Sequence, residues 1–258
     1  MIKRNAFNLT MLALAGSVVA SPVLAQDSTA GNVAQAAAAL GKGFAGSSFQ
    51  IPVANGAGWG SAGAGVYVQT VDSPSNDYDG SMGLNLGLGN PAEYVGLSLA
   101  ANLSSLTGSG GPDSFGEAGS FGAKLHTNLP GLTSFAVGVN GIGRFGQIKK
   151  VGTSSVYAVI SKGFVLGTQG LTAHLGVGDN GFTTPGKSGI GVFGGLAYHI
   201  IPQLSLIAEN TGRFSNVAVS WAPIKSWPVT ITGGATNLEQ RFGLDTQFGL
   251  SVATGINF

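Results

Sequence analysis

The C-terminal stretch of the chain, residues 246–258, reads Thr-Gln-Phe-Gly-Leu-Ser-Val-Ala-Thr-Gly-Ile-Asn-Phe. Large residues alternate with small or polar ones along it. One face carries Phe248, Leu250, Val252, Thr254, Ile256 and Phe258, and the other carries Gly249, Ser251, Ala253, Gly255 and Asn257. Because successive side chains of a β-strand point to opposite faces, this period of two predicts a strand with one large apolar face.

The same alternation recurs upstream. Residues Met82, Leu84, Leu86 and Leu88, for example, share one face, with Gly, Ser and Asn opposite. Turn signals separate such runs and predict about twelve strands, with roughly ten to fourteen compatible with the pattern. The predicted strands span residues 59–71, 80–89, 94–103, 115–126, 134–143, 153–163, 171–178, 189–199, 204–210, 216–222, 229–235 and 246–258.

Composition separates two folds that use this alternation. A soluble β-sandwich would cover its outer face with charged residues. Here the second face is Gly, Ser, Ala and Asn, Gly makes up 44 of 258 residues, and charged residues are 9% of the chain, against about 25% in an ordinary domain. A transmembrane barrel turns the large face to lipid and the small face to a lumen. The sequence therefore predicts an all-β protein, a single antiparallel up-and-down transmembrane β-barrel over residues 59–258.

The first 58 residues do not follow the strand pattern. Residues 1–25 have a basic start, an apolar run and small residues at their end, the layout of a secretory signal peptide, with cleavage predicted between Ala25 and Gln26. Residues 26–58 form a leader with a possible short helix at 33–40. This leader could lie in the periplasm, tuck into a lumen or stay flexible.

The connections between predicted strands alternate in character. Odd connections, such as residues 72–79 and 104–114, are long and hold most of the charge, whereas even ones are often built around proline, as at Pro130 and Pro202. A barrel with both chain ends in the periplasm has short periplasmic turns and longer extracellular loops. The charged end is therefore predicted to be extracellular.

The last strand also resembles the terminal strand of Gram-negative outer-membrane β-barrel proteins, which alternates apolar residues and ends on an aromatic residue. The matching residues are Val252, Thr254, Gly255, Ile256 and Phe258. The resemblance is to porin-like barrels in general, without a subfamily. It implies the cell outer membrane as location, its lipid as surroundings, and the barrel-assembly machinery as the partner that reads this strand.

Strand register predicts which polar residues face the lumen. A charge facing lipid at mid-depth would cost about 2–4 kcal/mol, so ionisable residues within strands are assigned inward. The predicted lumen-lining residues are Asn85, Asn102, Lys124, His126, Asn140, Thr172, His174, His199 and Glu209. A wet lumen predicts a passive, porin-like channel for small solutes. The alternatives are a structural or interaction barrel that presents its surface loops, and an outer-membrane hydrolase.

Few motifs point to chemistry. Residues 181–188 match the phosphate-loop pattern, but the glycine-rich residues after them favour a strand over the helix that the motif needs. The histidines fall on three separate predicted strands, which argues against a metal site. The chain has no cysteine and a net charge of +1, which gives no sign of nucleic-acid binding. We therefore expect no enzyme activity, catalytic residue, metal or cofactor, and the oligomeric state stays open.

Overall fold

The computed structural model describes residues 42–71, 78–104, 106, 116–146, 148–151 and 153–258. The predicted signal peptide with its cleavage site at Ala25 and Gln26, and the predicted helix at 33–40, lie outside these residues. None of the helices in the described part of the chain has the length and apolar character needed to cross a membrane.

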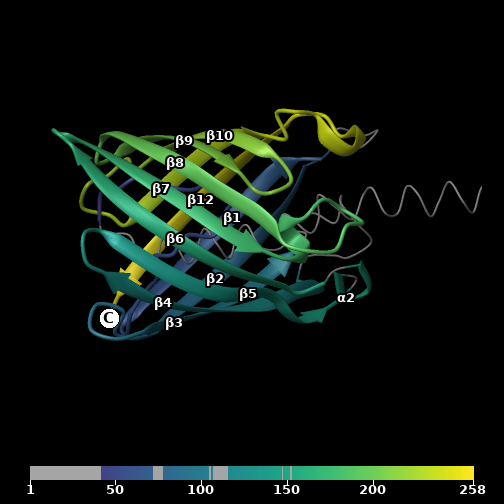
Figure 1. Cartoon of the computed structure of the whole chain (residues 1–258), viewed down its shortest axis with the longest axis horizontal. Helices are drawn as coiled ribbons and strands as arrows, with labels where there is room; N and C mark the ends of the chain where they lie inside the picture. Colours follow the sequence, from purple (N-terminus) through teal and green to yellow (C-terminus); the bar gives the residue numbers. More distant parts are fainter. Residues whose placement is uncertain (1–41, 72–77, 105, 107–115, 147, 152) are drawn as a thin grey trace, which may run out of the picture.

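Twelve antiparallel strands close into one up-and-down barrel, in which each strand pairs with its neighbours in sequence and β1 pairs with β12 (Figure 1). This confirms the predicted fold class and strand number. The strands are β1 (Ser61–Thr70), β2 (Tyr78–Gly89), β3 (Gly96–Ser104), β4 (Ala118–Leu129), β5 (Thr133–Phe145), β6 (Ser155–Leu166), β7 (Gln169–Gly178), β8 (Gly191–Ile201), β9 (Leu204–Asn210), β10 (Ser215–Trp221), β11 (Val229–Thr236) and β12 (Gln247–Asn257).

Predicted and observed strand ends differ by at most three residues, most at β4 and β6. β3 starts at Gly96 rather than residue 94, because the Tyr94 amide closes a turn on the Asn90 carbonyl. β4 runs on to Leu129, three residues past its predicted end, because Thr127 to Leu129 pair with the start of β5. Among the described residues, the connections contain three short helical turns, α2 (Ile148–Val151), η1 (Asn180–Phe182) and η2 (Arg241–Gly243).

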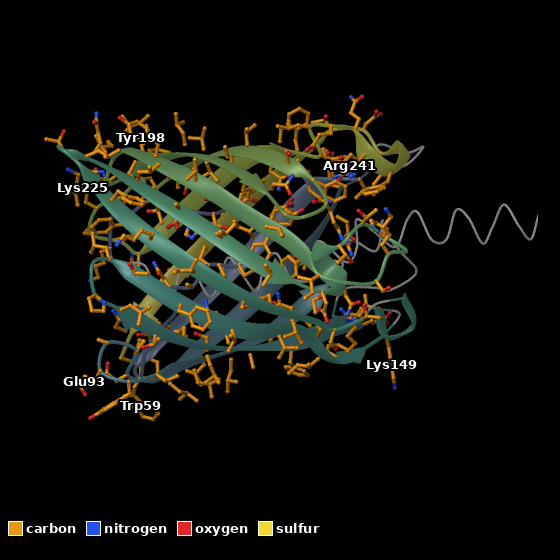
Figure 2. The ribbon with its side chains drawn as sticks, viewed as in Figure 1. Trp59, Glu93, Lys149, Tyr198, Lys225 and Arg241 are labelled. Atoms are coloured by element: carbon orange, nitrogen blue, oxygen red, sulfur yellow. The ribbon has the colours of Figure 1, made fainter. Side chains whose placement is uncertain are left out.

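The two faces of the barrel wall have opposite character. Large apolar side chains stand outward around the barrel (Figure 2), and many are about half exposed, such as Leu84 at 56% and Leu250 at 51%. The inner face is small or polar and buried, for example Ser98, Ser205 and Ser251. A soluble protein rarely exposes so continuous an apolar surface. This arrangement is that of a transmembrane barrel, with lipid as the outer solvent.

The barrel has two different ends. One end carries the tight connections β2–β3, β4–β5, β6–β7, β8–β9 and β10–β11, together with the start of β1 and the end of β12. We call it the turn end, and we call the opposite end the loop end. Trp59, Glu93 and Lys225 lie at the turn end, whereas Lys149 and Arg241 lie at the loop end (Figure 2). The C-terminus is also at the turn end (Figure 1).

Candidate functional site: a lumen occupied by residues 42–58

Residues 42–58, which we call the lumen segment, run inside the barrel rather than beside it. The segment enters at the turn end, where the Ala45 amide donates to the Pro202 carbonyl at 2.8 Å. It leaves at the same end, where the Trp59 amide donates to the Gly89 carbonyl at 2.7 Å before β1 begins. Between these points the side chains of Phe49, Ile51, Val53, Ala54 and Ala57 are buried. The segment therefore makes a loop that rises along one wall and descends along another.

A carboxylate on β9 holds the top of this loop. Glu209 Oε2 accepts a hydrogen bond from the Phe49 amide at 3.0 Å, and Glu209 Oε1 accepts one from the Gln50 amide at 2.7 Å. Asn216 Nδ2, on β10, donates to Oε1 at 3.2 Å, and the Ser48 hydroxyl makes a longer contact of 3.4 Å to Oε2. Both carboxylate oxygens thus bind consecutive backbone amides, an arrangement that charge-assisted hydrogen bonds make strong.

An ammonium group on β4 holds the descending limb. Lys124 Nζ donates to the Val53 carbonyl at 3.1 Å and to the Asn55 carbonyl at 2.7 Å, and only 1% of the residue is exposed. Burial of an ammonium group is costly unless acceptors replace water. The segment's own carbonyls supply these acceptors. The docked segment therefore offsets the cost of burying Lys124, while Lys124 holds the segment.

Hydroxyl groups of the wall bind the segment backbone at further points. The Gly46 amide donates to Ser220 Oγ at 2.8 Å, and Ser205 Oγ donates to the Gly46 carbonyl at 2.6 Å. On the opposite wall the Ala54 amide donates to Ser161 Oγ at 2.9 Å. A buried segment without regular structure must satisfy its backbone groups somewhere. The small polar face of the barrel meets that need.

Two apolar clusters complete the packing. Phe49 meets Tyr67 edge-on at 5.8 Å between ring centroids, in a cluster with Ala197, Ile207 and Ala218 of the wall. Ile51 and Ala54 pack with a group of inward aromatic side chains near the loop end, Tyr157, Phe182 and Phe193. Phe182 and Phe193 stack at 4.4 Å. These aromatic side chains lie where the lumen of an open pore would be filled with water.

Glycine allows the segment to pack closely against the wall at two positions. A side chain at Gly56 would overlap the imidazole of His126 on β4. The wall glycine Gly87 is equally crowded, since a Cβ there would run into Ala57 and the Gly58 carbonyl. The glycine-rich composition of the chain therefore serves close packing inside the barrel, and not only the turns.

The loop end is covered by connections that bind each other. The Arg213 guanidinium donates to the carbonyls of Thr183 (2.8 Å) and Asn180 (2.6 Å), and burial lowers the pKa of this group. Arg241 Nη1 donates to the Arg213 carbonyl at 3.0 Å. The Glu239 carboxylate accepts the Ser215 amide at 2.9 Å and also the Ser215 hydroxyl. Three loop-end connections, β7–β8, β9–β10 and β11–β12, are thus tied together.

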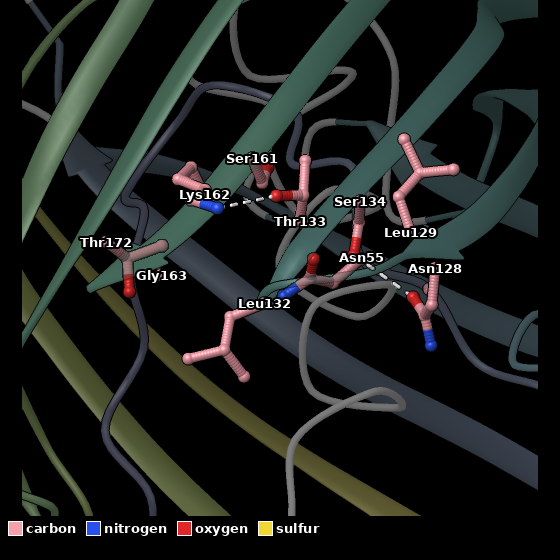
Figure 3. Close-up of a pocket in the computed structure, with 11 residues that line it drawn as sticks. Asn55, Asn128, Leu129, Leu132, Thr133, Ser134, Ser161, Lys162, Gly163 and Thr172 are labelled. Atoms are coloured by element: carbon pink, nitrogen blue, oxygen red, sulfur yellow. Dashed lines mark hydrogen bonds between the residues drawn. The ribbon is translucent and has the colours of Figure 1, made fainter. Parts of the chain in front are cut away.

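A hollow remains at the turn end beside the segment. It has a volume of about 490 Å³ and is lined by Asn55 and Gly56 of the segment and by the ends of β4 to β7 (Figure 3). Ser134 and Thr172 line it from the wall, and Lys162 Nζ bonds to Thr133 Oγ1 at its edge. This hollow forms a vestibule between the segment and the medium at the turn end.

The predicted lumen-lining residues all lie on the inner face. Asn85, Asn102, Lys124, His126, Asn140, His174 and Glu209 are buried, while Thr172 and His199 are partly exposed nearer the turn end. The histidines do not converge, and the described residues contain no group of three or more His, Cys, Asp or Glu side chains able to hold a metal ion. After the phosphate-loop match at 181–188, the chain continues into β8.

Sequence reasoning missed the inward aromatic residues, and it left the docking of the lumen segment as one of three alternatives for residues 26–58. Tyr67 shares the inner face of β1 with Gly63, Gly65 and Gln69, so strict alternation alone could have found it. Tyr157 and Phe193 follow the same rule on β6 and β8. The contacts of residues 42–58 have no such signal, because they depend on backbone groups.

One serine and histidine pair has the outline of a nucleophile and its base. Ser161 Oγ lies 2.7 Å from His174 Nδ1, and His174 Nε2 lies 3.1 Å from the Ser47 carbonyl. Such a pair is the starting point of covalent catalysis. Here Ser161 Oγ also accepts the Ala54 amide and is buried under the segment.

No protein-family model matches the chain, and no curated protein does. Similar solved structures include an outer membrane channel from Pseudomonas putida F1, at 12% identity and TM-score 0.48, covering 80% of this chain and 97% of that one. Another is LpxR from Salmonella typhimurium, at 10% identity and TM-score 0.40, covering 74% of this chain and 99% of that one. The chain has the fold of outer-membrane β-barrels. The prediction that the protein is not an enzyme is corrected, because a barrel of this fold by itself leaves enzyme activity open.

Proposed function

We propose that the protein is a porin-like outer-membrane channel for small solutes that its own lumen segment holds closed. The observation that carries this proposal is the mode of attachment of the segment. Glu209 and Lys124 hold it from different parts of the wall by hydrogen bonds to its backbone. No strand of the barrel needs the segment for its pairing partners, since β1 to β12 form a closed ring without it.

The inner wall suits both a closed and an open state. Serine, asparagine, lysine and glutamate side chains that bind the segment can bind water instead once it leaves. A lumen built only to be filled would gain more from apolar side chains, because a buried charge is costly to desolvate. The presence of Glu209 and Lys124 on the inner face therefore supports a lumen that becomes wet.

The same proposal includes topology and biogenesis. The turn end faces the periplasm and the loop end faces outward, in line with the short turns and longer loops of outer-membrane barrels. Residues 1–25 direct export. The barrel-assembly machinery reads the final strand through Val252, Thr254, Gly255, Ile256 and Phe258.

A disulfide lock tests the proposal. A Cβ at Gly46 would lie 3.1 Å from Ser220 Oγ, so cysteines at both positions fall in the range of disulfide geometry, with Cβ atoms about 3.5–4.5 Å apart. The natural chain has no cysteine to interfere. We expect the refolded protein carrying Gly46→Cys and Ser220→Cys to conduct in planar bilayers when reduced and to be silent when oxidised. Each single-cysteine variant serves as a control that redox conditions should not affect.

A structural barrel is the second candidate, favoured by the two apolar clusters around Phe49 and Ile51. Under that alternative the segment is a permanent core. The reduced double-cysteine protein would then stay silent, even with Glu209→Gln and Lys124→Met added to weaken the segment's attachment. Equal currents in the oxidised and reduced states would contradict the gating role of the segment but leave a channel.

A further inference from the structure

The top of the lumen segment is a site built from hydrogen-bond donors. The Phe49 amide, the Gln50 amide and Asn216 Nδ2 converge on the two oxygens of one carboxylate, with the Ser48 hydroxyl at the longer distance of 3.4 Å. We call the first three donors the carboxylate cradle, because the single hydroxyl proton of Ser48 goes to the Ile51 carbonyl at 2.6 Å. Glu209 occupies it from the wall.

A small cavity separates this region from the loop-end connections. It has a volume of about 10 Å³ and is lined by Gln50 of the segment, by Gln69 and Gln247 of the wall, and by Phe214 and Leu244 of the connections, among others. That volume corresponds to about one water molecule. Gln247 is only 7% exposed, and its Nε2 has no hydrogen-bond partner among the described residues. An unused donor therefore lines the cavity next to the cradle.

We propose that the carboxylate cradle is a binding site for the carboxylate of a small acidic solute, which competes with Glu209 for the Phe49 and Gln50 amides. This inference rests on the proposed closed channel. A solute that takes over the amides releases the segment from β9, and the segment then opens the lumen to that class of solute.

The geometry favours a carboxylate over a single-atom anion. The amides of Phe49 and Gln50 bind different oxygens of Glu209, at 3.0 and 2.7 Å, so the site matches a planar group with two acceptors. A single chloride ion offers one acceptor atom, which the two amides would have to share. Glu209 is tethered, and an internal competitor acts at an effective concentration of the order of millimolar. Apparent affinities for the solute are therefore expected in the millimolar range.

Chemical rescue tests the cradle on the full-length chain. Val53→Cys places one thiol in the buried part of the segment, in a protein without other cysteines, and its rate of reaction with a maleimide reports undocking. With Glu209→Ala added, we expect sodium acetate to slow labelling about tenfold in a saturable way, because acetate fills the vacant cradle. Sodium chloride at equal ionic strength is the control. Equal effects of acetate and chloride, or no effect of either, would overturn the inference.

A second measurement keeps Glu209 and so does not depend on the folding of the alanine variant. In the Val53→Cys protein we expect succinate to accelerate labelling and, in bilayers, to increase channel openings. Faster labelling without current would support the binding site and contradict the channel. Currents controlled by the 46–220 disulfide but indifferent to succinate and acetate would support the channel and contradict the binding site.

Discussion

Replacing Glu209 by glutamine preserves the size of the side chain but removes one of its two acceptors. The glutamine oxygen can still accept one amide of the lumen segment, while its NH₂ group faces the other amide, donor to donor. Because the Phe49 and Gln50 amides both bind the carboxylate in the native protein, one buried donor loses its partner. An unsatisfied buried donor costs about 1–3 kcal/mol, and a bond to a charged group contributes about 1.5–3 kcal/mol.

An opposing effect reduces the net change. Docking of the segment removes water from the Glu209 carboxylate, and a neutral amide is cheaper to desolvate. We therefore expect docking to weaken by about 2 kcal/mol, which is roughly a thirtyfold rise in the undocked population at about 1.4 kcal/mol per tenfold. The Glu239→Gln variant is the matched control, because Glu239, in the β11–β12 connection, binds Ser215 at the start of β10 and not the segment.

Maleimide labelling of Val53→Cys measures this change directly. The labelling rate should rise about thirtyfold with Glu209→Gln and stay unchanged with Glu239→Gln, while both proteins keep the heat-modifiable gel mobility of a folded barrel. An unchanged labelling rate in the Glu209→Gln protein would refute the idea that this carboxylate holds the segment. Unfolding of the barrel itself would refute the separation of wall stability from segment docking.

Three further changes test other contacts. Lys124→Met should weaken docking of the segment by about 1–2 kcal/mol, because the Val53 and Asn55 carbonyls lose their donor. Lys162→Met at the vestibule edge is the control. Equal labelling rates of Val53→Cys in the two variants would count against a role for Lys124. Gly56→Ala should weaken docking of the segment by about 1–3 kcal/mol, because its Cβ would overlap His126. Gly233→Ala is the control, since its Cβ would meet its nearest neighbour at 3.6 Å, and the labelling rate should equal that of the parent. Equal labelling rates in the two variants would contradict the tight contact at Gly56. Burial alone would raise the pKa of Glu239, but hydrogen bonds from the Ser215 hydroxyl and amide, with Arg241 nearby, lower it on balance. Protection of the Ser215 amide from hydrogen exchange should therefore be complete above the ordinary glutamate pKa of 4.5 and be lost as the pH falls through the lowered value, and Glu239→Gln should remove this pH dependence.

The barrel wall could be predicted from sequence because its rule is local. The alternation of large and small residues along β12, from Phe248 to Ile256, indicates which face meets lipid, and the same alternation recurs in each long strand. The ends of strands were less accurate. The turn that delays β3 depends on a hydrogen bond from Tyr94 to Asn90, and such a bond has no periodic signature.

The site was predictable only on the wall side. Register placed Lys124 and Glu209 on the inner face, because a charge facing lipid would be costly. Their partners could not be predicted in the same way. Phe49, Gln50, Val53 and Asn55 contribute backbone amides and carbonyls, which every residue possesses. The polar residues of the inner wall therefore fit both a water-filled lumen and a lumen filled by residues 42–58.

The two charged residues are not a salt bridge, and this distinction explains their positions. Glutamate only accepts hydrogen bonds and lysine only donates them. Glu209 meets the segment where its amides point to the wall, and Lys124 meets it where its carbonyls do. Each charged side chain thus fits the backbone groups that the segment presents at its position. If the two residues were exchanged, the lysine would face N–H donors and the glutamate would face carbonyl acceptors. A wall selected for open conduction alone would place no such demand on sign and position, whereas a wall that must hold one segment in one path would.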